Sequence, residues 1–168
     1  MTATTARTYT SHVVVRWSDM DIFKHVNHAR MVTLLEEARI DSLISAGPDI
    51  ANLFGTSVVA GIEVRYRTPL THSDSPLAVT MWIEKLRAVD VTLRYEVRSA
   101  HAAADSKPAV TATTQLAFAD PEAGTLRRLS ADERAALAAW TTADWPQSST
   151  RRAEVRRGLQ IGFASHAT

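Results

Sequence analysis

The sequence predicts an α+β domain in which one long helix lies against a mainly antiparallel β-sheet. Two observations carry this prediction. A single long helical pattern of apolar residues occurs in the first third of the chain, and four runs of alternating apolar and polar residues follow it. Runs that follow one another along the chain through short connections are typical of antiparallel strands, so the helix must cover one face of the sheet.

The first strand is predicted at His12–Trp17, where three valines stand in a row. A helix is predicted from about His28 to Ala46. The residues that form its apolar stripe are Met31, Leu34, Leu35 and Ala38. Gly47-Pro48 then ends the helix, because glycine closes helices and proline cannot continue one.

Four further strands are predicted from period-two alternation. They are Ile62–Arg67, Leu77–Leu86, Val91–Val97 and Val110–Phe118. Pro69 ends the first of the four, and His72–Pro76 has the composition of a turn. The second and third are close enough along the chain to form a hairpin.

The last fifty residues are predicted to form a separate element. Ser130–Glu133 is a capping-box sequence, which predicts a short helix over Arg134–Trp140. A basic run follows, with Arg151, Arg152, Arg156 and Arg157. It could contact substrate phosphates, but a solvated face or tail is favoured. The predicted organisation is an extension at 1–10, the α+β domain at 11–120, and the helix with the basic tail at 121–168.

Composition excludes several classes of protein. The 168 residues, 45% of them hydrophobic, suffice for one domain with a sizeable core. Nineteen basic and eighteen acidic residues leave a net charge of +1, which does not favour nucleic-acid binding. The chain has no cysteine, no apolar run of membrane-spanning length and no signal-peptide pattern, so we expect a cytoplasmic protein without membrane insertion.

The segment Val15–Leu43 places polar, titratable residues where the long helix begins. The first turn of a helix has backbone N–H groups without intrahelical partners, and the helix dipole adds positive potential there. Asp21, just before the helix, could act on a carbonyl carbon whose oxygen these N–H groups polarise. Asn27 is a good N-cap candidate.

The same segment resembles hotdog-fold acyl-CoA thioesterases of the 4-hydroxybenzoyl-CoA thioesterase-like branch, which includes small bacterial long-chain acyl-CoA thioesterases. The matching residues are Arg16, Asp21, His25, Val26, Asn27 and Glu36–Arg39. Val64–Leu70, with Ser73 and Asp74, gives a weaker second match. The resemblance covers about residues 10–120, so the tail lies outside it. It implies a long central helix wrapped by a curved five-stranded sheet, and a homodimer or homotetramer with active sites between subunits.

The resemblance implies that Asp21 either attacks the thioester carbon or activates water, a choice that the sequence leaves open. The alternative is that Asp21 only caps a turn or the helix. His25 could orient the carboxylate, hold water, contact the thioester or simply pack. Asn27 is expected to cap the helix and secondarily to contact substrate, while the N–H groups of His28 and Ala29 polarise the carbonyl.

Two departures from the family pattern bear on the substrate. His28 replaces an asparagine, and Met31 replaces a tyrosine that is common there. Met31 would give a more apolar, adaptable wall, so a fatty or aromatic acyl group is expected. The remaining candidates for the phosphates of coenzyme A (CoA) are Arg65 and Arg67, and more weakly Lys85, Arg87 and Arg94.

The other acidic residues near the motif are interpreted as structural. Asp19 is expected in a turn, and Glu36 and Glu37 on the helix surface, with an ion pair available between Glu36 and Arg39. No metal or cofactor is expected, because His25 and His28 lack a third ligand and CoA belongs to the substrate.

Two alternatives stay open. An acyl-CoA hydratase or dehydratase of the same fold is disfavoured, because Asp21 and His25 lie four residues apart without the Asn-Pro of the hydratase motif. A dimer that binds acyl chains or a partner without turnover is the other.

Overall fold

The computed structural model describes residues 8–103, 105–138, 140 and 141. Its strands are β1 (Tyr9–Val13), β2 (Ser57–Tyr66), β3 (Leu77–Leu86), β4 (Asp90–Ser99), β5 (Val110–Asp120) and β6 (Thr125–Leu126). Its helices are α1 (His28–Ala46), α2 (Pro48–Gly55) and α3 (Ala131–Ala138), with two 3-10 turns, η1 (Trp17–Asp19) and η2 (His72–Asp74).

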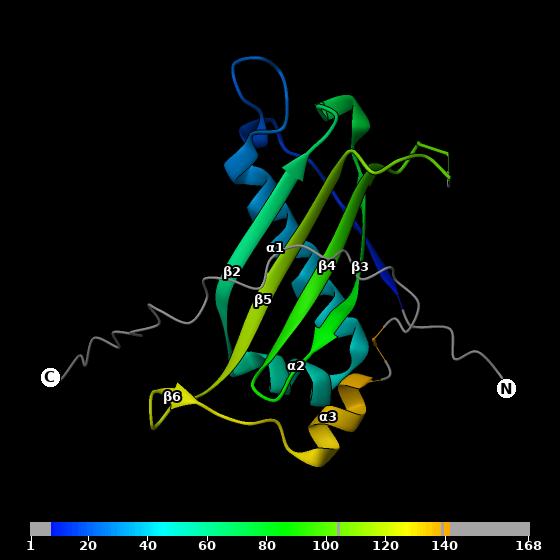
Figure 1. Cartoon of the computed structure of the whole chain (residues 1–168). Helices are drawn as coiled ribbons and strands as arrows, with labels where there is room; N and C mark the ends of the chain where they lie inside the picture. Colours follow the sequence, from blue (N-terminus) through cyan, green and yellow to red (C-terminus); the bar gives the residue numbers. More distant parts are fainter. Residues whose placement is uncertain (1–7, 104, 139, 142–168) are drawn as a thin grey trace, which may run out of the picture.

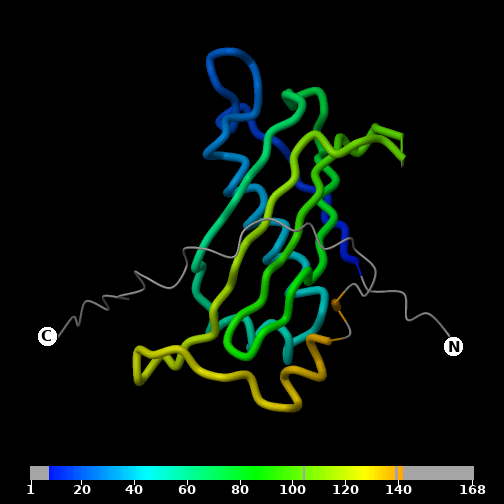
Figure 2. Tube along the Cα trace, in the orientation of Figure 1, coloured from blue at the N-terminus to red at the C-terminus, as the bar shows by residue number. Residues whose placement is uncertain are grey.

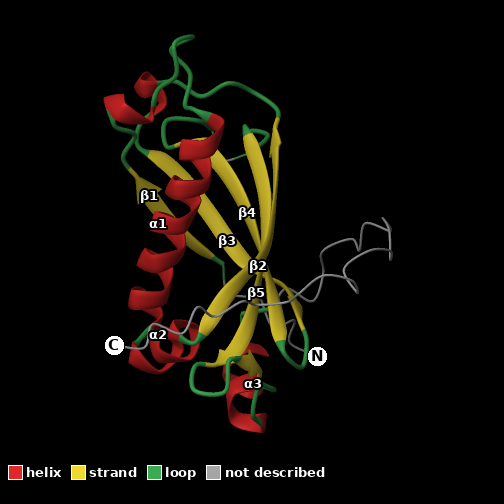
Figure 3. Ribbon diagram, turned by 90° about the vertical axis from the view of Figure 1, so that its left-hand side faces the viewer, coloured by secondary structure: helices red, strands yellow, loops and turns green. Residues whose placement is uncertain are grey.

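The sheet has the order β1-β3-β4-β5-β2, with β6 added beside β5, and each of these pairings is antiparallel. Figure 1 shows β2, β5, β4 and β3 in front of α1, and Figure 3 shows α1 lying along the inner face of the curved sheet. This is the hotdog fold, so the predicted fold class is confirmed. The predicted hairpin is also confirmed as β3 and β4.

α1 has the predicted bounds, and its apolar stripe faces the sheet. Met31, Leu34, Leu35 and Ala38 are all buried in the core. Gly47 closes the helix with a φ of 103°, a conformation that a residue with a side chain rarely adopts. The prediction missed α2, which begins directly at Pro48. Proline at a first helical position is the signal that could have revealed it.

The first strand was predicted too far along the chain. β1 ends at Val13, which pairs with Leu77, the first residue of β3. Beyond that point the described chain offers no strand as a partner, and the Val15 N–H donates instead to Ser75 Oγ at 3.0 Å. The three valines therefore cross from the sheet into the loop, and Trp17 begins η1.

β2 is longer than predicted and forms one edge of the sheet. It pairs with β5 on one side only, and none of its ten residues is buried. Val59, Ile62 and Tyr66 on this strand are among the exposed large hydrophobic residues. An edge strand with exposed apolar side chains is a surface suited to pairing with another chain.

The two ends of the molecule are formed by different elements. The trace in Figure 2 places the loop between β1 and α1 at the same end as the turn between β2 and β3, and the α2, α3 and β6 region at the other end. At that other end the predicted capping box is confirmed, since Ser130 N–H donates to Glu133 and Glu133 N–H donates to Ser130. The basic run from Arg151 lies outside the described residues. No helix in the described part is long and apolar enough to cross a membrane.

Candidate active site

The loop before α1 is held at its base by Asp19, which confirms the structural role predicted for this residue. Asp19 is buried, and its Oδ2 accepts the Arg16 N–H at 2.8 Å. Its carbonyl accepts the Asn27 N–H at 2.8 Å, and the Val26 N–H donates to the Leu70 carbonyl at 2.7 Å. Because both ends of the loop are tied to neighbouring backbone, the residues between them are held in place.

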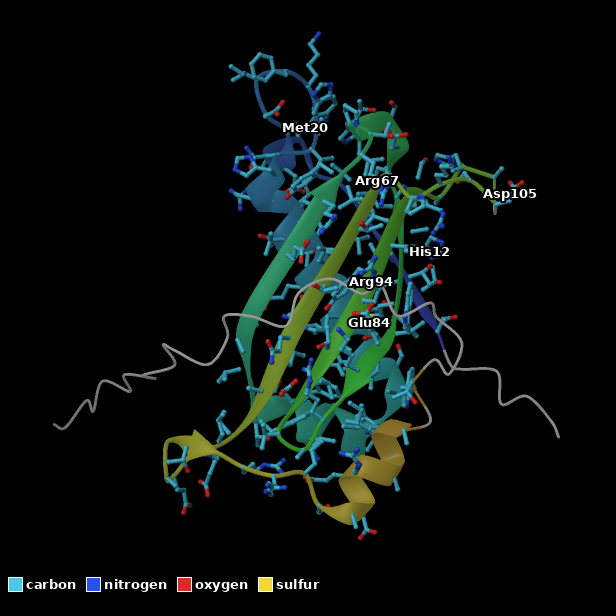
Figure 4. The ribbon with its side chains drawn as sticks, in the orientation of Figure 1. His12, Met20, Arg67, Glu84, Arg94 and Asp105 are labelled. Atoms are coloured by element: carbon cyan, nitrogen blue, oxygen red, sulfur yellow. The ribbon has the colours of Figure 1, made fainter. Side chains whose placement is uncertain are left out.

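Asp21 uses one carboxylate oxygen to shape this loop. Its Oδ1 accepts the N–H groups of Phe23 at 2.8 Å and His25 at 3.0 Å. Its own N–H donates to the His25 carbonyl at 2.8 Å. Oδ2 accepts no hydrogen bond from the described residues, and the side chain is only half-buried. The carboxylate is thus oriented through one oxygen while the other is available. Figure 4 marks the site by Met20, the preceding residue.

His25 contacts Asp21 through its backbone. The His25 ring, half-buried, has no hydrogen bond to any residue that the structure describes. Its neighbour Lys24 has a φ of 64°, the left-handed conformation that costs energy for a residue with a side chain. The loop therefore makes a tight turn around the Asp21 carboxylate.

The start of α1 offers one free backbone donor. Asn27 is the N-cap as predicted, and its side-chain oxygen accepts the N–H groups of Ala29 at 2.9 Å and Arg30 at 3.4 Å. The Ala29 N–H is therefore occupied by the cap. The His28 N–H has no acceptor in the described part of the chain. Of the two donors predicted to polarise a carbonyl, His28 is the one left free.

Tyr66, which lies in the second matching segment but was not predicted as a site residue, joins this helix start to the sheet. Its hydroxyl donates to the His28 carbonyl at 2.7 Å, across 38 positions of the sequence. Burial raises the pKa of Tyr66, which keeps the hydroxyl protonated as a donor. No local sequence pattern reveals which backbone carbonyl a tyrosine will reach.

The residues predicted to bind the phosphates of CoA do not lie in the loop around Asp21. Arg65 and Arg67 lie on the outer face of the sheet, opposite α1, in a polar furrow. Glu63, Glu84, Lys85, Thr92, Arg94 and Thr113 are among its other lining residues. Arg65 pairs with Glu63 at 2.8 Å, and Arg94 with Glu84 at 3.6 Å. Figure 4 shows Arg67, Arg94 and Glu84 along the sheet. Arg87 is not among the lining residues of the furrow, and it pairs with Asp90.

The remaining predicted residues have structural positions. Met31 is 1% exposed in the core, so it offers no wall to a ligand in the described chain. Glu36 pairs with Arg39 at 3.1 Å, as predicted. Glu37 pairs with Arg16 at 2.9 Å, and this hydrogen bond raises the pKa of the Arg16 guanidinium. Both glutamates therefore serve as helix-surface partners.

A largely apolar groove runs between α1 and the β2 edge. Its lining includes Ile40, Leu43, Ile44, Phe54, Val59 and Leu116. Ile40 is 50% exposed and Ile44 69% exposed, which is high for apolar residues on a helix that faces the core elsewhere. Val59 lies both in this groove and on the exposed β2 edge. Among the described residues, no cluster of three His, Cys, Asp or Glu could hold a metal ion.

Comparison with protein families decides what this fold and loop belong to. A family model described as the thioesterase-like superfamily matches residues 15–156, which includes the Asp21 loop and the whole of the sheet from β2 onward. The chain belongs to the thioesterase-like superfamily. It is a thioester hydrolase with a hotdog fold. The match extends past residue 120, where the resemblance seen in the sequence ended.

Solved structures of thioesterases superpose on the chain. A thioesterase from Thermus thermophilus, complexed with coenzyme A and Zn, is 25% identical with a TM-score of 0.64, over 78% of this chain and 92% of that one. The DHNA-CoA thioesterase from Staphylococcus aureus is 21% identical with a TM-score of 0.65, over 78% and 89%. YbaW from Escherichia coli is 24% identical with a TM-score of 0.67, over 78% and 97%. No curated protein matches the chain in sequence.

Proposed function

We propose that this thioesterase hydrolyses a fatty or aromatic acyl-CoA to the free acid and CoA, with Asp21 as the reacting carboxylate. The observation that carries the proposal is that the two oxygens of this carboxylate differ in their hydrogen bonds. Oδ1 accepts two backbone N–H groups, whereas Oδ2 accepts no hydrogen bond from the described residues. At the nearby start of α1, the His28 N–H also has no acceptor among the described residues. A thioester carbonyl bound there would have a donor for its oxygen and a carboxylate for its carbon.

Two routes fit this arrangement. In one, Oδ2 takes a proton from water, the hydroxide attacks the carbonyl carbon, and the thiolate leaves and is protonated. In the other, Oδ2 itself attacks, the thiolate leaves, and water hydrolyses the mixed anhydride to regenerate Asp21. Both need an ionised carboxylate, and neither requires a metal or prosthetic group. The His28 N–H stabilises the oxyanion in each route.

Asn27 and His25 support this chemistry in different ways. Asn27 binds the Ala29 N–H and so fixes the first turn of α1 in which the His28 N–H lies. The His25 ring, free of hydrogen bonds to the described residues, is available to hold the attacking water or the thioester. The Asn27 side-chain oxygen already accepts two hydrogen bonds, so it is less suited to direct contact with substrate.

We also propose that the enzyme is a homodimer joined through β2. Pairing of two β2 strands would satisfy the free edge and cover Val59, Ile62 and Tyr66. Antiparallel pairing centred between Gly61 and Ile62 places Tyr66 of the partner subunit opposite Ser57. Because Tyr66 is bonded to the start of its own α1, the partner's catalytic loop would lie beside the apolar groove.

In this proposed dimer the acyl chain would bind in the groove. Met31 is buried in the core, so the apolar wall expected from it is provided instead by Ile40, Ile44 and Val59. A fatty or aromatic acyl group would fit these side chains better than a strongly polar one. With no cysteine in the chain and the usual availability of CoA thioesters inside cells, we place the reaction in the cytoplasm.

The test is thiol release from short, long and aromatic acyl-CoAs by the wild type and by Asp21→Asn. Turnover by the wild type that falls by orders of magnitude in Asp21→Asn supports the proposal. Equal turnover by both proteins would reject Asp21 as the reacting group, and absence of turnover on every acyl-CoA would reject this substrate class.

The dimer has its own test. Ile62→Lys places a charge at the middle of the free edge, and we expect it to give monomers in light scattering and to lose most activity. Leu126→Lys, at an exposed apolar position on β6, is the matched control and should leave the dimer intact. A wild type that is monomeric at working concentration would contradict the proposal.

A further inference from the structure

Beside the catalytic loop, an exposed tryptophan lies flat on a histidine. Trp17 is 77% exposed, and its ring stacks on the ring of His72 with centroids 4.1 Å apart and planes 6° from parallel. Indole is rarely left so exposed in a protein that has a core to receive it. Here one face is covered by the imidazole, and most of the remaining surface is open.

Both rings stand on backbone that is fixed by the same device. Trp17 is the first residue of η1, where the Asp19 carboxylate accepts the Arg16 N–H at 2.8 Å. His72 is the first residue of η2, where the Asp74 carboxylate accepts the Thr71 N–H at 2.8 Å. Each ring is therefore held by a capped turn. A flat surface held in advance costs little ordering entropy when a ligand binds to it.

The same two turns are tied to the catalytic loop. Asp19, the last residue of η1, accepts the Asn27 N–H through its carbonyl, and Asp21 lies only two positions further on. Leu70, two residues before η2, accepts the Val26 N–H at 2.7 Å. The Trp17–His72 stack is consequently part of the rim of the proposed active site.

The proposed dimer does not account for this exposed surface. It covers the apolar residues of β2, the acyl group would cover Ile40 and Ile44 of α1, and Leu126 lies apart on β6. The exposed large hydrophobic residues left over are Val14, Trp17, Ile22 and Phe23. All four lie within seven positions of Asp21. Exposed apolar side chains on the segment that carries the proposed reacting group are typical of a ligand-binding surface.

We propose that Trp17, backed by His72, stacks a planar aromatic ring of the thioester substrate. This inference rests on the proposed function. Two parts of such a substrate carry a flat ring: the adenine of CoA, and the acyl group where that group is aromatic. Stacking of a base on an aromatic side chain is strong enough to change affinity about tenfold or more. The stack would therefore act as a binding subsite that selects substrates by the ring they carry.

The experiment measures binding rather than turnover, so that it is independent of the reaction. Thioether analogues, which cannot be hydrolysed, are made in four forms: a fatty and an aromatic group, each on CoA and on pantetheine, which lacks adenine. Their affinities are measured by calorimetry for the wild type, Trp17→Ala and Trp17→Phe. Leu126→Ala is the control for loss of an exposed apolar side chain away from the site.

The pattern of losses identifies the ring. If adenine is stacked, Trp17→Ala binds both CoA analogues about tenfold or more weakly and both pantetheine analogues as the wild type does. If the acyl ring is stacked, the two aromatic analogues weaken and the two fatty ones do not. In either case Trp17→Phe, which keeps an aromatic face, loses much less.

Other patterns overturn the inference. Equal affinities of Trp17→Ala and the wild type for all four analogues, a uniform loss across all four, or no binding by the wild type would each do so. Failure of the proposed function gives a different result. A protein that binds CoA analogues through Trp17 but releases no thiol would support the stacking subsite and reject acyl-CoA hydrolysis. Dimer size and thermal unfolding of each variant verify that it is folded.

Discussion

The loop that carries Asp21 and the outer furrow both contain polar residues that the sequence predicted to be functional, yet their side chains are arranged in opposite ways. In the loop, Asp21 is fixed by backbone donors and keeps one oxygen unpaired among the described residues. In the furrow, Arg65 and Arg94 each have a carboxylate partner, Glu63 and Glu84. The loop uses backbone hydrogen bonds to orient a carboxylate, whereas the furrow pairs two of its four basic side chains with carboxylates.

This difference separates a site from a charged surface. A group suited to react must be oriented and still have an atom to offer, which the loop achieves and two of the furrow's arginines do not. Arg67 and Lys85 differ from these two, since neither forms an ion pair with the described residues, and both stay candidates for a CoA phosphate. The comparison therefore predicts large effects for variants of the loop and small ones for variants of the furrow.

The largest expected effect is that of Asp21→Asn. Loss of the ionised carboxylate should lower kcat about 100-fold or more, as removal of a general base or nucleophile does. Asn keeps an oxygen that can accept the Phe23 and His25 N–H groups, so thermal unfolding should change little. Arg65→Gln and Arg67→Gln should leave kcat near the wild-type value. An increase of about tenfold in the KM for acyl-CoA in Arg67→Gln would show that the furrow is part of the site.

The sequence predicted the parts of this comparison that depend on local pattern. α1 and its stripe follow from helical spacing, the Asn27 cap from residue type next to a helix start, and the Ser130 capping box from its four residues. The position of β1 was wrong because a strand ends where its partner begins, at Leu77, which is a long-range property. Met31 was placed on a wall by its motif position, but the stripe to which it belongs faces the core.

Contacts between distant segments also account for what was missed at the site. Tyr66 bonds to His28, and Trp17 stacks on His72, only because the turns after β1 and β2 meet at one end of the sheet. Neither residue has a motif around it that fixes its partner. The furrow likewise depends on register, since Arg65 and Arg94 come from strands that are separated by β5.

Asn27→Ala is expected to have the second largest effect. It removes the acceptor of the Ala29 and Arg30 N–H groups and should cost about 1 kcal/mol of stability. Because the first turn then frays where the His28 N–H lies, kcat should fall about tenfold, near the range for a lost oxyanion donor. Ser130→Ala, which removes the cap of α3, should cost similar stability and no activity. Equal activity of Asn27→Ala and the wild type would show that the start of α1 does not contribute to catalysis.

Tyr66→Phe should have a smaller effect of the same kind. Loss of the hydroxyl bond to His28 should cost about 1 kcal/mol of stability and lower kcat a few-fold, with little change in KM. Burial raises the pKa of Tyr66, so the hydroxyl's contribution to stability is fully present below the ordinary tyrosine pKa of about 10 and is lost as pH rises through the higher folded value. Unfolding of both proteins at neutral pH and above about pH 10 checks this, and a stability difference that persists unchanged at high pH would contradict it.

The smallest expected effect tests whether the loop stores strain that the furrow does not. Lys24 adopts a φ of 64°, which costs about 1 kcal/mol in a residue with a side chain. Lys24→Gly and Lys24→Ala both remove the ammonium group, but only glycine relieves the backbone, and its extra freedom in the unfolded chain offsets part of the gain. Lys24→Gly should therefore be about 0.5 kcal/mol more stable than Lys24→Ala in denaturant unfolding. If the two variants are equally stable, the turn around Asp21 is unstrained, and its shape is set by the carboxylate bonds alone. If glycine stabilises the fold but lowers kcat, the stiffness of a side-chain-bearing residue at this position is itself part of how Asp21 is held.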